Sequence, residues 1–174
     1  MILPDSSIAG HTIIREIQPN DIGHVSRIYA RSWKAAYAGL VPQAYLDDLK
    51  EDRWSPILAK SGFTSLVLLD DGRYIGTSSF GSARDETLPG WGEIVSIYLM
   101  PQYYGQGYGE KLLDAVVSSL AQEGYADIYL WVLSENRRAR RFYEKHHFRH
   151  NGDTKRIKIG GAQLPALRYV RHIG

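Results

Sequence analysis

The chain has 174 residues, of which 44% are hydrophobic and 23% are charged, so it is long enough for one well-buried core and short for two. We therefore expect a single domain over residues 1–174. Its net charge of +2 is small for a protein whose main partner is nucleic acid. Because cysteine is absent, disulfides, thiolate metal sites and an acyl-cysteine intermediate are excluded.

The N-terminal sequence gives no sign of export. Residues 1–7 lack the basic start and the long apolar segment of a signal peptide. No apolar run in the chain approaches membrane-spanning length. We expect a cytoplasmic protein without a membrane partner.

The first third of the chain predicts one strand and three helical stretches. His11 to Ile17 predict the strand, and Pro19-Asn20-Asp21 then supply helix-start residues. A helix follows, and Gly39 ends it. Its apolar side chains recur at helical spacing, which predicts one buried face: Val25, Ile28, Tyr29 and Trp33. Shorter helical stretches run from about Pro42 to Leu49 and from Trp54 to Lys60.

The middle of the chain predicts three strands and a helix. Ser65–Leu69 and Arg73–Phe80 read as two strands, and Asp70-Asp71-Gly72 between them is typical of a hairpin turn. Trp91 to Met100 predict a further strand. The next helix begins near Gly107, can end at Gly124, and has one apolar face: Leu112, Leu113, Val116, Val117 and Leu120.

The C-terminal third predicts a strand, a short helix and two more strands. Ile128 to Leu133 are apolar at nearly every position, which is typical of a central strand covered on both faces. A short helix spans about Asn136 to His146. Arg149–Ile159 and Leu164–Arg171 then form two strands that turn at Gly160-Gly161. This order of elements predicts a mixed α/β fold.

A glycine-rich turn, Tyr104-Gly105-Gln106-Gly107-Tyr108-Gly109, joins a predicted strand to a predicted helix. Such a turn presents backbone N–H groups and the positive end of a helix to an anion, and phosphate is the expected ligand. The turn lacks the Lys-Ser/Thr pair of a nucleotide P-loop, and its glycine spacing differs from the dinucleotide-binding pattern. A tight turn that binds nothing remains the alternative.

Two segments together resemble a known family. The run from Gly92 to Pro101, with the turn at 102–109, resembles the acetyl-CoA-binding segment of the GNAT superfamily of N-acetyltransferases. The segment from Asn136 to Phe148 is similar to that family's later helix and the strand that it feeds. The resemblance implies an α/β fold with a mixed, mostly antiparallel central sheet, helices on both faces and a splayed central strand pair.

The resemblance also implies acetyl-CoA as the acetyl donor. The main chain of Ile97, Tyr98 and Leu99 would pair with its pantetheine arm. The pyrophosphate would meet backbone N–H groups of the turn, so the expected acetyl-CoA-binding residues are Tyr104, Gly105, Gln106, Gly107, Tyr108, Gly109 and, at the start of the later motif, Asn136. Two positions depart from the family pattern: Tyr104 stands where Gln or Arg is usual, and His147 where Gly is usual and a left-handed backbone is expected.

Two side chains are candidates for the chemistry of acetyl transfer. An amine with a pKa near 10.4 is mostly protonated at pH 7, so a base is useful, and Glu93 matches a carboxylate position used by some family members. Tyr143 is in the family position for a hydroxyl that stabilises the departing thiolate. The alternatives are a structural carboxylate at position 93 and, at position 143, an aromatic ring packed beside Phe142.

The acceptor pocket is less well defined by the sequence. In the family the first helices usually form it, which nominates Trp33 and Tyr37, with Tyr45 beside them and Asp47 or Asp48 as partners for a cation. Core packing is the alternative for Trp33 and Tyr37. The acceptor would be a primary amine of a small molecule or a peptide. The histidines show no zinc-binding spacing, so we expect no metal.

Other functions remain open alternatives. Arg137, Arg138, Arg140 and Arg141 form a basic cluster that could mark a nucleic-acid-binding module, although nucleic acid is not the expected partner. A non-catalytic acyl-CoA sensor would have the same fold. The edge of the C-terminal strands could pair with a second copy, which would give a homodimer.

Overall fold

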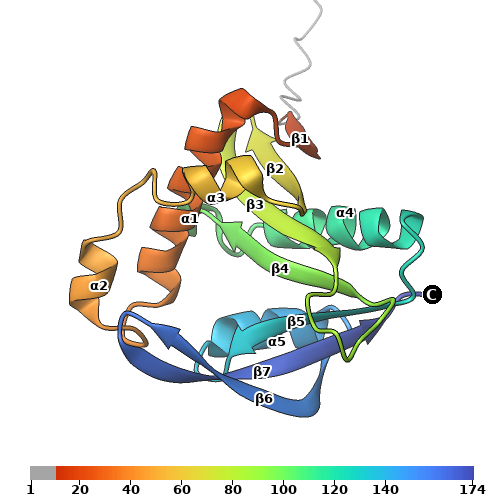
Figure 1. The fold of residues 1–174 in the computed structure, drawn as a ribbon. Helices are drawn as coiled ribbons and strands as arrows, with labels where there is room; N and C mark the ends of the chain where they lie inside the picture. Colours follow the sequence, from red (N-terminus) through yellow and green to blue (C-terminus); the bar gives the residue numbers. More distant parts are fainter. Residues whose placement is uncertain (1–10) are drawn as a thin grey trace, which may run out of the picture.

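The computed structural model describes residues 11–174 (Figure 1). The prediction that residues 1–7 form no signal peptide lies outside this range. The elements follow the predicted order, with two short 3-10 turns added, η1 (Pro19–Asp21) and η2 (Pro101–Tyr103). Each strand and helix predicted from the sequence is confirmed in type.

Seven strands form one sheet in the order β1-β2-β3-β4-β5-β7-β6. Neighbouring strands are antiparallel, except for the central pair β4 and β5, which is parallel. The strands are β1 (Thr12–Glu16), β2 (Thr64–Asp70), β3 (Arg73–Ser82), β4 (Gly92–Leu99), β5 (Asp127–Leu133), β6 (Arg149–Ile159) and β7 (Ala162–His172). This is the mixed, mostly antiparallel sheet that the family resemblance implied.

Helices cover both faces of the sheet, as expected. Figure 1 shows three helices on one face, namely α1 (Ile22–Ala36), α2 (Gln43–Asp47) and α3 (Ser55–Lys60). The other face carries α4 (Tyr108–Gln122) and α5 (Arg137–Lys145). Each face therefore has its own apolar core, and the sheet separates the two.

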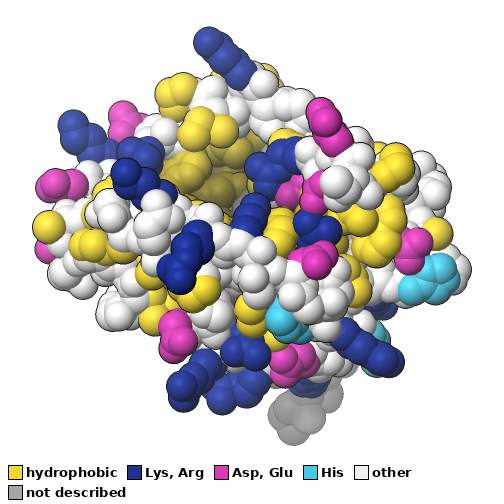
Figure 2. Space-filling model, turned by 60° about the horizontal axis from the view of Figure 1, so that its bottom comes forward, with side chains coloured by type: hydrophobic (Ala, Val, Ile, Leu, Met, Phe, Trp, Pro, Cys, Tyr) yellow, Lys and Arg dark blue, Asp and Glu magenta, His cyan; other side chains and the backbone are white. Residues whose placement is uncertain are grey.

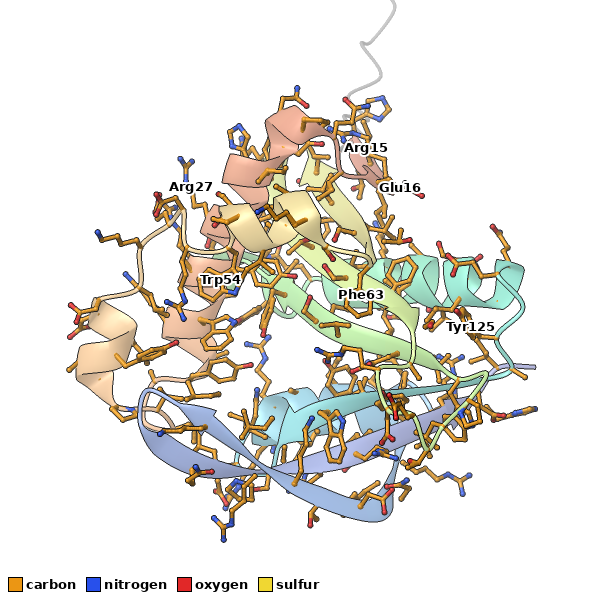
Figure 3. All side chains as sticks on the ribbon, in the orientation of Figure 1. Arg15, Glu16, Arg27, Trp54, Phe63 and Tyr125 are labelled. Carbon is orange, nitrogen blue, oxygen red and sulfur yellow. The ribbon has the colours of Figure 1, made fainter. Side chains whose placement is uncertain are left out.

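The core under α4 follows directly from the helical spacing of its apolar residues. Leu112, Leu113, Val116 and Leu120 are all 0% exposed. Burying a side chain of this kind contributes roughly 1.5–3 kcal/mol, so this one stripe fixes α4 against the sheet. On the opposite face, Val25 and Tyr29 of α1 pack with Trp54, which Figure 3 labels where α1 and α3 meet. These helices hold the central strands from both sides.

Two turns have the backbone that their residues predict. In the β2–β3 hairpin Asp71 and Gly72 both have positive φ angles, 47° and 76°, as a tight two-residue hairpin turn requires. His147 after α5 has a φ angle of 70°, which confirms the left-handed backbone expected there. That turn directs Phe148 into the core beside Tyr143, where it is 1% exposed. It thereby helps to position the end of α5.

Candidate active site

The two central strands separate soon after they begin. Only Gly92 with Ile128 and Glu93 with Tyr129 are paired between β4 and β5. Beyond these pairs the strands diverge around a cavity of about 680 Å³. The splayed pair that the resemblance implied is therefore present, and the backbone of β4 beyond Glu93 has no neighbour on its β5 side.

The cavity passes from one face of the sheet to the other. On the face of α4 and α5, here called the α5 side, it is lined by Tyr104, Gly109, Asn136, Arg138, Phe142 and Tyr143. On the opposite face, the α1 side, it is lined by Trp33, Tyr37, Tyr45, Arg53, Lys155 and Ile157. Figure 2 shows a hollow with an apolar floor and several Lys and Arg side chains around its rim. Two ligands that enter from opposite faces would meet between β4 and β5.

The glycine turn stands at the α5 side, immediately before α4. Gly105 and Gly107 have φ angles of 70° and 85°, which an L side chain adopts only with strain. The backbone N–H groups of residues 105–107 donate to no protein atom within residues 11–174. Together with the N-terminus of the 15-residue helix α4, they offer a group of free donors to an anion.

The expected acetyl-CoA-binding residues divide into two groups. Six line the cavity: Ile97, Tyr98, Leu99, Tyr104, Gly109 and Asn136. The other four, Gly105, Gln106, Gly107 and Tyr108, form the turn beside it. Gln106 donates from Nε2 to the carbonyl of Gln102 at 3.0 Å, and Tyr108 donates its hydroxyl to Asp70 at 3.0 Å. Both side chains are thus engaged elsewhere, which leaves the backbone of the turn for a ligand.

The middle of β4 is irregular where it borders the cavity. The register with β3 shifts between Ser79 and Phe80, so Val95 has no partner on β3. The next residue, Ser96, is hydrogen-bonded to α1, because its Oγ lies 2.6 Å from the hydroxyl of Tyr29. Such a bulge bends a strand and re-aims the backbone groups beside it.

Glu93 lies where the two strands begin to separate. Its side chain is 2% exposed and accepts hydrogen bonds from Arg84, from Nη2 at 2.6 Å and from the backbone N–H at 3.0 Å. Burial acts to raise the pKa of Glu93, but the bonds from Arg84 outweigh it and the pKa lies below its ordinary value. Burial and the neighbouring Glu93 raise the pKa of the Tyr129 hydroxyl to about 12. At neutral pH the site therefore holds a carboxylate and a neutral phenol.

Tyr143 projects from α5 into the cavity and is 9% exposed. Burial raises the pKa of its hydroxyl above the ordinary value, with a smaller contribution from Tyr37. The hydroxyl has no hydrogen-bond partner within residues 11–174, whereas Tyr37 and Tyr98 bond to one another at 3.3 Å. Tyr143 is thus a protonated donor that is free to serve a ligand.

The α1 side contains the nominated aromatic residues. Trp33 and Tyr37 line it, their rings meet edge to face at 4.9 Å, and both are partly buried against the core. The Trp33 Nε1 is buried without a hydrogen-bond partner in the described part of the chain. Tyr45 also lines the cavity, and the β6–β7 turn presses against it: a Cβ at Gly160 would stand 2.7 Å from its ring.

The charged residues of the α1 side differ from those nominated by sequence. Asp47 and Asp48 do not line the cavity, and Asp47 instead accepts a hydrogen bond from Gln43 at 2.8 Å. Apart from Glu93, the charged residues that line this side and the adjoining part of the cavity are basic, and sequence reasoning did not assign them to this site: Arg53, Arg84 and Lys155. Arg53 and Arg84 lie in irregular segments, and Lys155 reaches the cavity only because the strand order brings β6 there. No local sequence pattern therefore identifies these residues.

The arginine cluster of α5 is partly used within the protein. Arg140 donates to the Tyr169 hydroxyl and to the carbonyl of Ser134, both at 3.0 Å. Arg138 stacks over the ring of Tyr104, with its guanidinium carbon 3.4 Å from the ring centre. The cluster is therefore not a uniform basic surface, and Arg138 belongs to the α5 side of the cavity.

Within residues 11–174 no three His, Cys, Asp or Glu side chains gather in a way that could hold a metal ion. None of the helices in the same range is long and apolar enough to cross a membrane.

Comparison with known proteins assigns the family. Residues 25–148 match the model of the Acetyltransferase (GNAT) family. The chain is 31% identical over 127 residues to YuaI of Bacillus subtilis, described as an uncharacterized N-acetyltransferase, covering 71% of this chain and 72% of that protein. It is 22% identical over 143 residues to a spermidine N(1)-acetyltransferase of Thermoplasma acidophilum, covering 78% and 87% of the two chains.

The fold agrees with a solved structure as well. The crystal structure of PaiA N-acetyltransferase from Thermoplasma acidophilum in complex with coenzyme A has a TM-score of 0.73 to this chain, at 19% identity. The match covers 94% of this chain and 99% of the other. The family match, the splayed central strands and the free N–H groups before α4 agree with one another, and the chain belongs to the GNAT family of acetyl-CoA-dependent N-acetyltransferases.

Proposed function

We propose that this protein transfers the acetyl group of acetyl-CoA directly to a primary amine, with both substrates bound at once. The observation that carries this proposal is the cavity between β4 and β5, which is lined from both faces of the sheet. Acetyl-CoA on the α5 side and an amine on the α1 side would meet without a covalent enzyme intermediate. The chain has no cysteine to form such an acyl intermediate.

The α5 side suits acetyl-CoA, which supplies an activated acetyl group as a thioester. The turn from Tyr104 to Gly109 would hold the pyrophosphate through its backbone N–H groups. The unpaired edge of β4 at Ile97, Tyr98 and Leu99 would hydrogen-bond the pantetheine arm as a neighbouring strand does. Asn136 uses its Oδ1 to accept from the Ala139 N–H at 3.2 Å, which leaves its Nδ2 for a ligand.

Glu93 is proposed as the base. Direct proton transfer from an ammonium with a pKa near 10.4 to a carboxylate below about 4.5 is uphill by roughly 6 units or more, so the amine must react in its neutral form. The nitrogen becomes strongly acidic as its bond to the acetyl carbon forms. At that stage even a weakly basic carboxylate can accept the proton through a bridging water.

Tyr143 is proposed as the group that stabilises the thiolate. The C–S bond breaks as the N–C bond forms, and the sulfur takes on negative charge. A protonated hydroxyl without another partner can donate to that sulfur. Because a phenol has a pKa near 10 and a thiol near 8.5, hydrogen bonding serves this role at least as well as full proton transfer.

Initial-rate kinetics test the proposal. Direct transfer predicts intersecting double-reciprocal lines when acetyl-CoA and amine are varied together, and no mass increase of the protein after incubation with acetyl-CoA alone. Parallel lines with an acetylated protein would contradict it. Acetyl-CoA binding without thiol release on any amine would instead favour the sensor, and salt-sensitive binding of RNA without acetyl-CoA binding would favour the nucleic-acid module.

A further inference from the structure

The charge on the α1 side of the cavity indicates which amine is accepted. Three basic residues line the cavity there and near the point where β4 and β5 are still paired: Arg53, Arg84 and Lys155. One carboxylate, Glu93, faces them, and it is bound to Arg84. We infer that the acceptor is a small amine that also carries an anionic group, a carboxylate or a phosphoryl group, beside an apolar body. This inference rests on the proposed function.

Two of the three basic residues form no direct ion pair. Arg53 and Lys155 have no carboxylate oxygen within 4.0 Å among residues 11–174. A protonated amine without an acid group would bring a further positive charge to this lining. An anionic substituent instead supplies the counter-charge that the lining lacks.

Two of these cations are held in place by aromatic rings. The Lys155 Nζ lies 4.4 Å from the centre of the Trp131 ring. Arg53 lies over Tyr45 and Trp54 at 5.8 and 5.7 Å, and its Nη2 lies 3.3 Å from the Tyr45 hydroxyl. Cations stacked on rings keep their outer face for a ligand. Burial is the largest cause that lowers the pKa of Lys155; Arg84 and Arg168 lower it further, and Glu93 and Asp85 only partly oppose them.

A second hollow continues the site beyond Lys155. It has a volume of about 700 Å³ and shares Arg84, Glu93, Trp131 and Lys155 with the cavity. Arg168 lies in its wall, is 8% exposed, and has a buried Nε without a hydrogen-bond partner in the described part of the chain. Asp85 and Asp153 pair with its other nitrogens. This hollow extends the polar region in which an acid group can sit.

The anion site on the α1 side is separate from the one proposed for the pyrophosphate. That group would bind at the turn before α4, on the opposite face of the sheet. Lys155 comes from β6, and Arg53 precedes α3. A basic lining on this side therefore serves the second substrate.

The remaining lining of the α1 side is apolar and aromatic. Trp33, Tyr37, Trp131, Ile157 and Ile159 contribute to it. A free amino acid with an apolar side chain combines all three required parts: an amine, an acid group close to it and an apolar body. Its aminophosphonate analogue has the same three parts.

Matched sets of amines test this inference in a thiol-release assay with acetyl-CoA. One set is L-phenylalanine, its aminophosphonate analogue, L-phenylalaninamide and 2-phenylethylamine. The other is L-leucine, its aminophosphonate analogue, L-leucinamide and isopentylamine. Spermidine serves as a polycationic amine. The acid-bearing members should have kcat/KM values at least tenfold above the amide and the simple amine, and the two acids in each set will show whether carboxylate or phosphonate is preferred.

Variants then locate the anion site. Lys155→Gln and Arg53→Gln should raise KM for the acid-bearing amines at least tenfold and change the values for the simple amines less than threefold. Lys60→Gln, an exposed lysine of α3 outside the cavity, is the control and should change neither. The affinity for acetyl-CoA, measured by calorimetry, should stay the same in all three variants.

The outcomes separate this inference from the proposed function. Equal or better turnover of the amides, the simple amines or spermidine would overturn the inference and leave acetyl transfer intact. The inference is also overturned if protein that acetylates the simple amines acetylates no acid-bearing amine, or if Lys155→Gln affects all amines equally. Failure to bind acetyl-CoA at all would instead overturn the proposed function.

Discussion

Replacing Glu93 by Gln separates a catalytic carboxylate from a structural one. Gln keeps the volume of the side chain and removes the charge that Arg84 contacts at 2.6 Å. A positioned base contributes roughly 10²–10⁴-fold to a rate, or about 2.7–5.4 kcal/mol of the barrier. We expect kcat to fall at least about 100-fold, at the lower end of that range. The affinity for acetyl-CoA should stay unchanged, because Glu93 lies where β4 and β5 are still paired and not in the turn before α4.

The matched control breaks the same ion pair from its other side. Arg84→Gln leaves the carboxylate in place and removes the guanidinium hydrogen bonds, while the backbone N–H at position 84 still donates to Glu93. Because it leaves a buried carboxylate without its cation, Arg84→Gln should lower the melting temperature at least as much as Glu93→Gln, but only Glu93→Gln should lower kcat strongly. The assay is thiol release at saturating acetyl-CoA and saturating amine, with calorimetric melting run in parallel.

The pH profile adds a second readout. Because the pKa of Glu93 lies below its ordinary value, the carboxylate stays ionised above about pH 5, and deprotonation of the amine alone should shape the profile between pH 6 and 9. The Glu93→Gln profile should run parallel to that of the wild type at a lower level. In Arg84→Gln the burial of Glu93 is no longer offset, so its pKa should rise and activity should fall on the acid side. A kcat for Glu93→Gln within threefold of wild type, or an equal loss in Arg84→Gln, would refute the role as base.

Two further predictions concern single side chains, Tyr143 and Asp21. Tyr143→Phe should lower kcat about 10–100-fold, because one hydrogen-bond donor to the developing negative charge is lost. The melting temperature should stay unchanged, because the hydroxyl has no partner within residues 11–174. Equal rates for the variant and the wild type would show that Tyr143 only packs in the core. Asp21 is 0% exposed and bonded to Arg15 at 2.6 Å, which holds its pKa far below the ordinary value. Its ionised form therefore stabilises the fold above about pH 4, and this contribution is lost as the pH falls further. Asp21→Asn should cost about 1–3 kcal/mol in urea melts at pH 7 and less at pH 3, and an equal cost at both would contradict this.

The local sequence determines most of the fold. Apolar spacing in α4, the Asp71-Gly72 turn and the apolar run of β5 each identify an element without reference to the rest of the chain. The exact ends were harder to predict, because they depend on caps and turns. Gly39, for example, was expected to end α1, whereas the helix ends at Ala36, three residues earlier.

For the candidate site, too, the parts that are contiguous in sequence could be predicted and the parts that depend on the tertiary fold could not. The turn at 104–109 is contiguous in sequence, so its anion-binding geometry could be predicted. The basic lining of the α1 side could not, because Arg53 and Lys155 are about a hundred positions apart and meet only through the sheet order β4-β5-β7-β6. The lowered pKa of Glu93 likewise depends on Arg84, whose loop folds back across β4.

Calorimetric titration with acetyl-CoA tests the central claim most directly. Gly107→Val places a branched side chain in the turn before α4, where the φ angle is 85°. Gly90→Val is the matched control: its φ angle is 79°, its Cβ would also meet open space, and it lies in the loop between β3 and β4, outside the turn before α4. The account predicts one-site binding to the wild type and to Gly90→Val, and at least tenfold weaker binding to Gly107→Val. Equal affinity for all three folded proteins, or no binding to any of them, would contradict it.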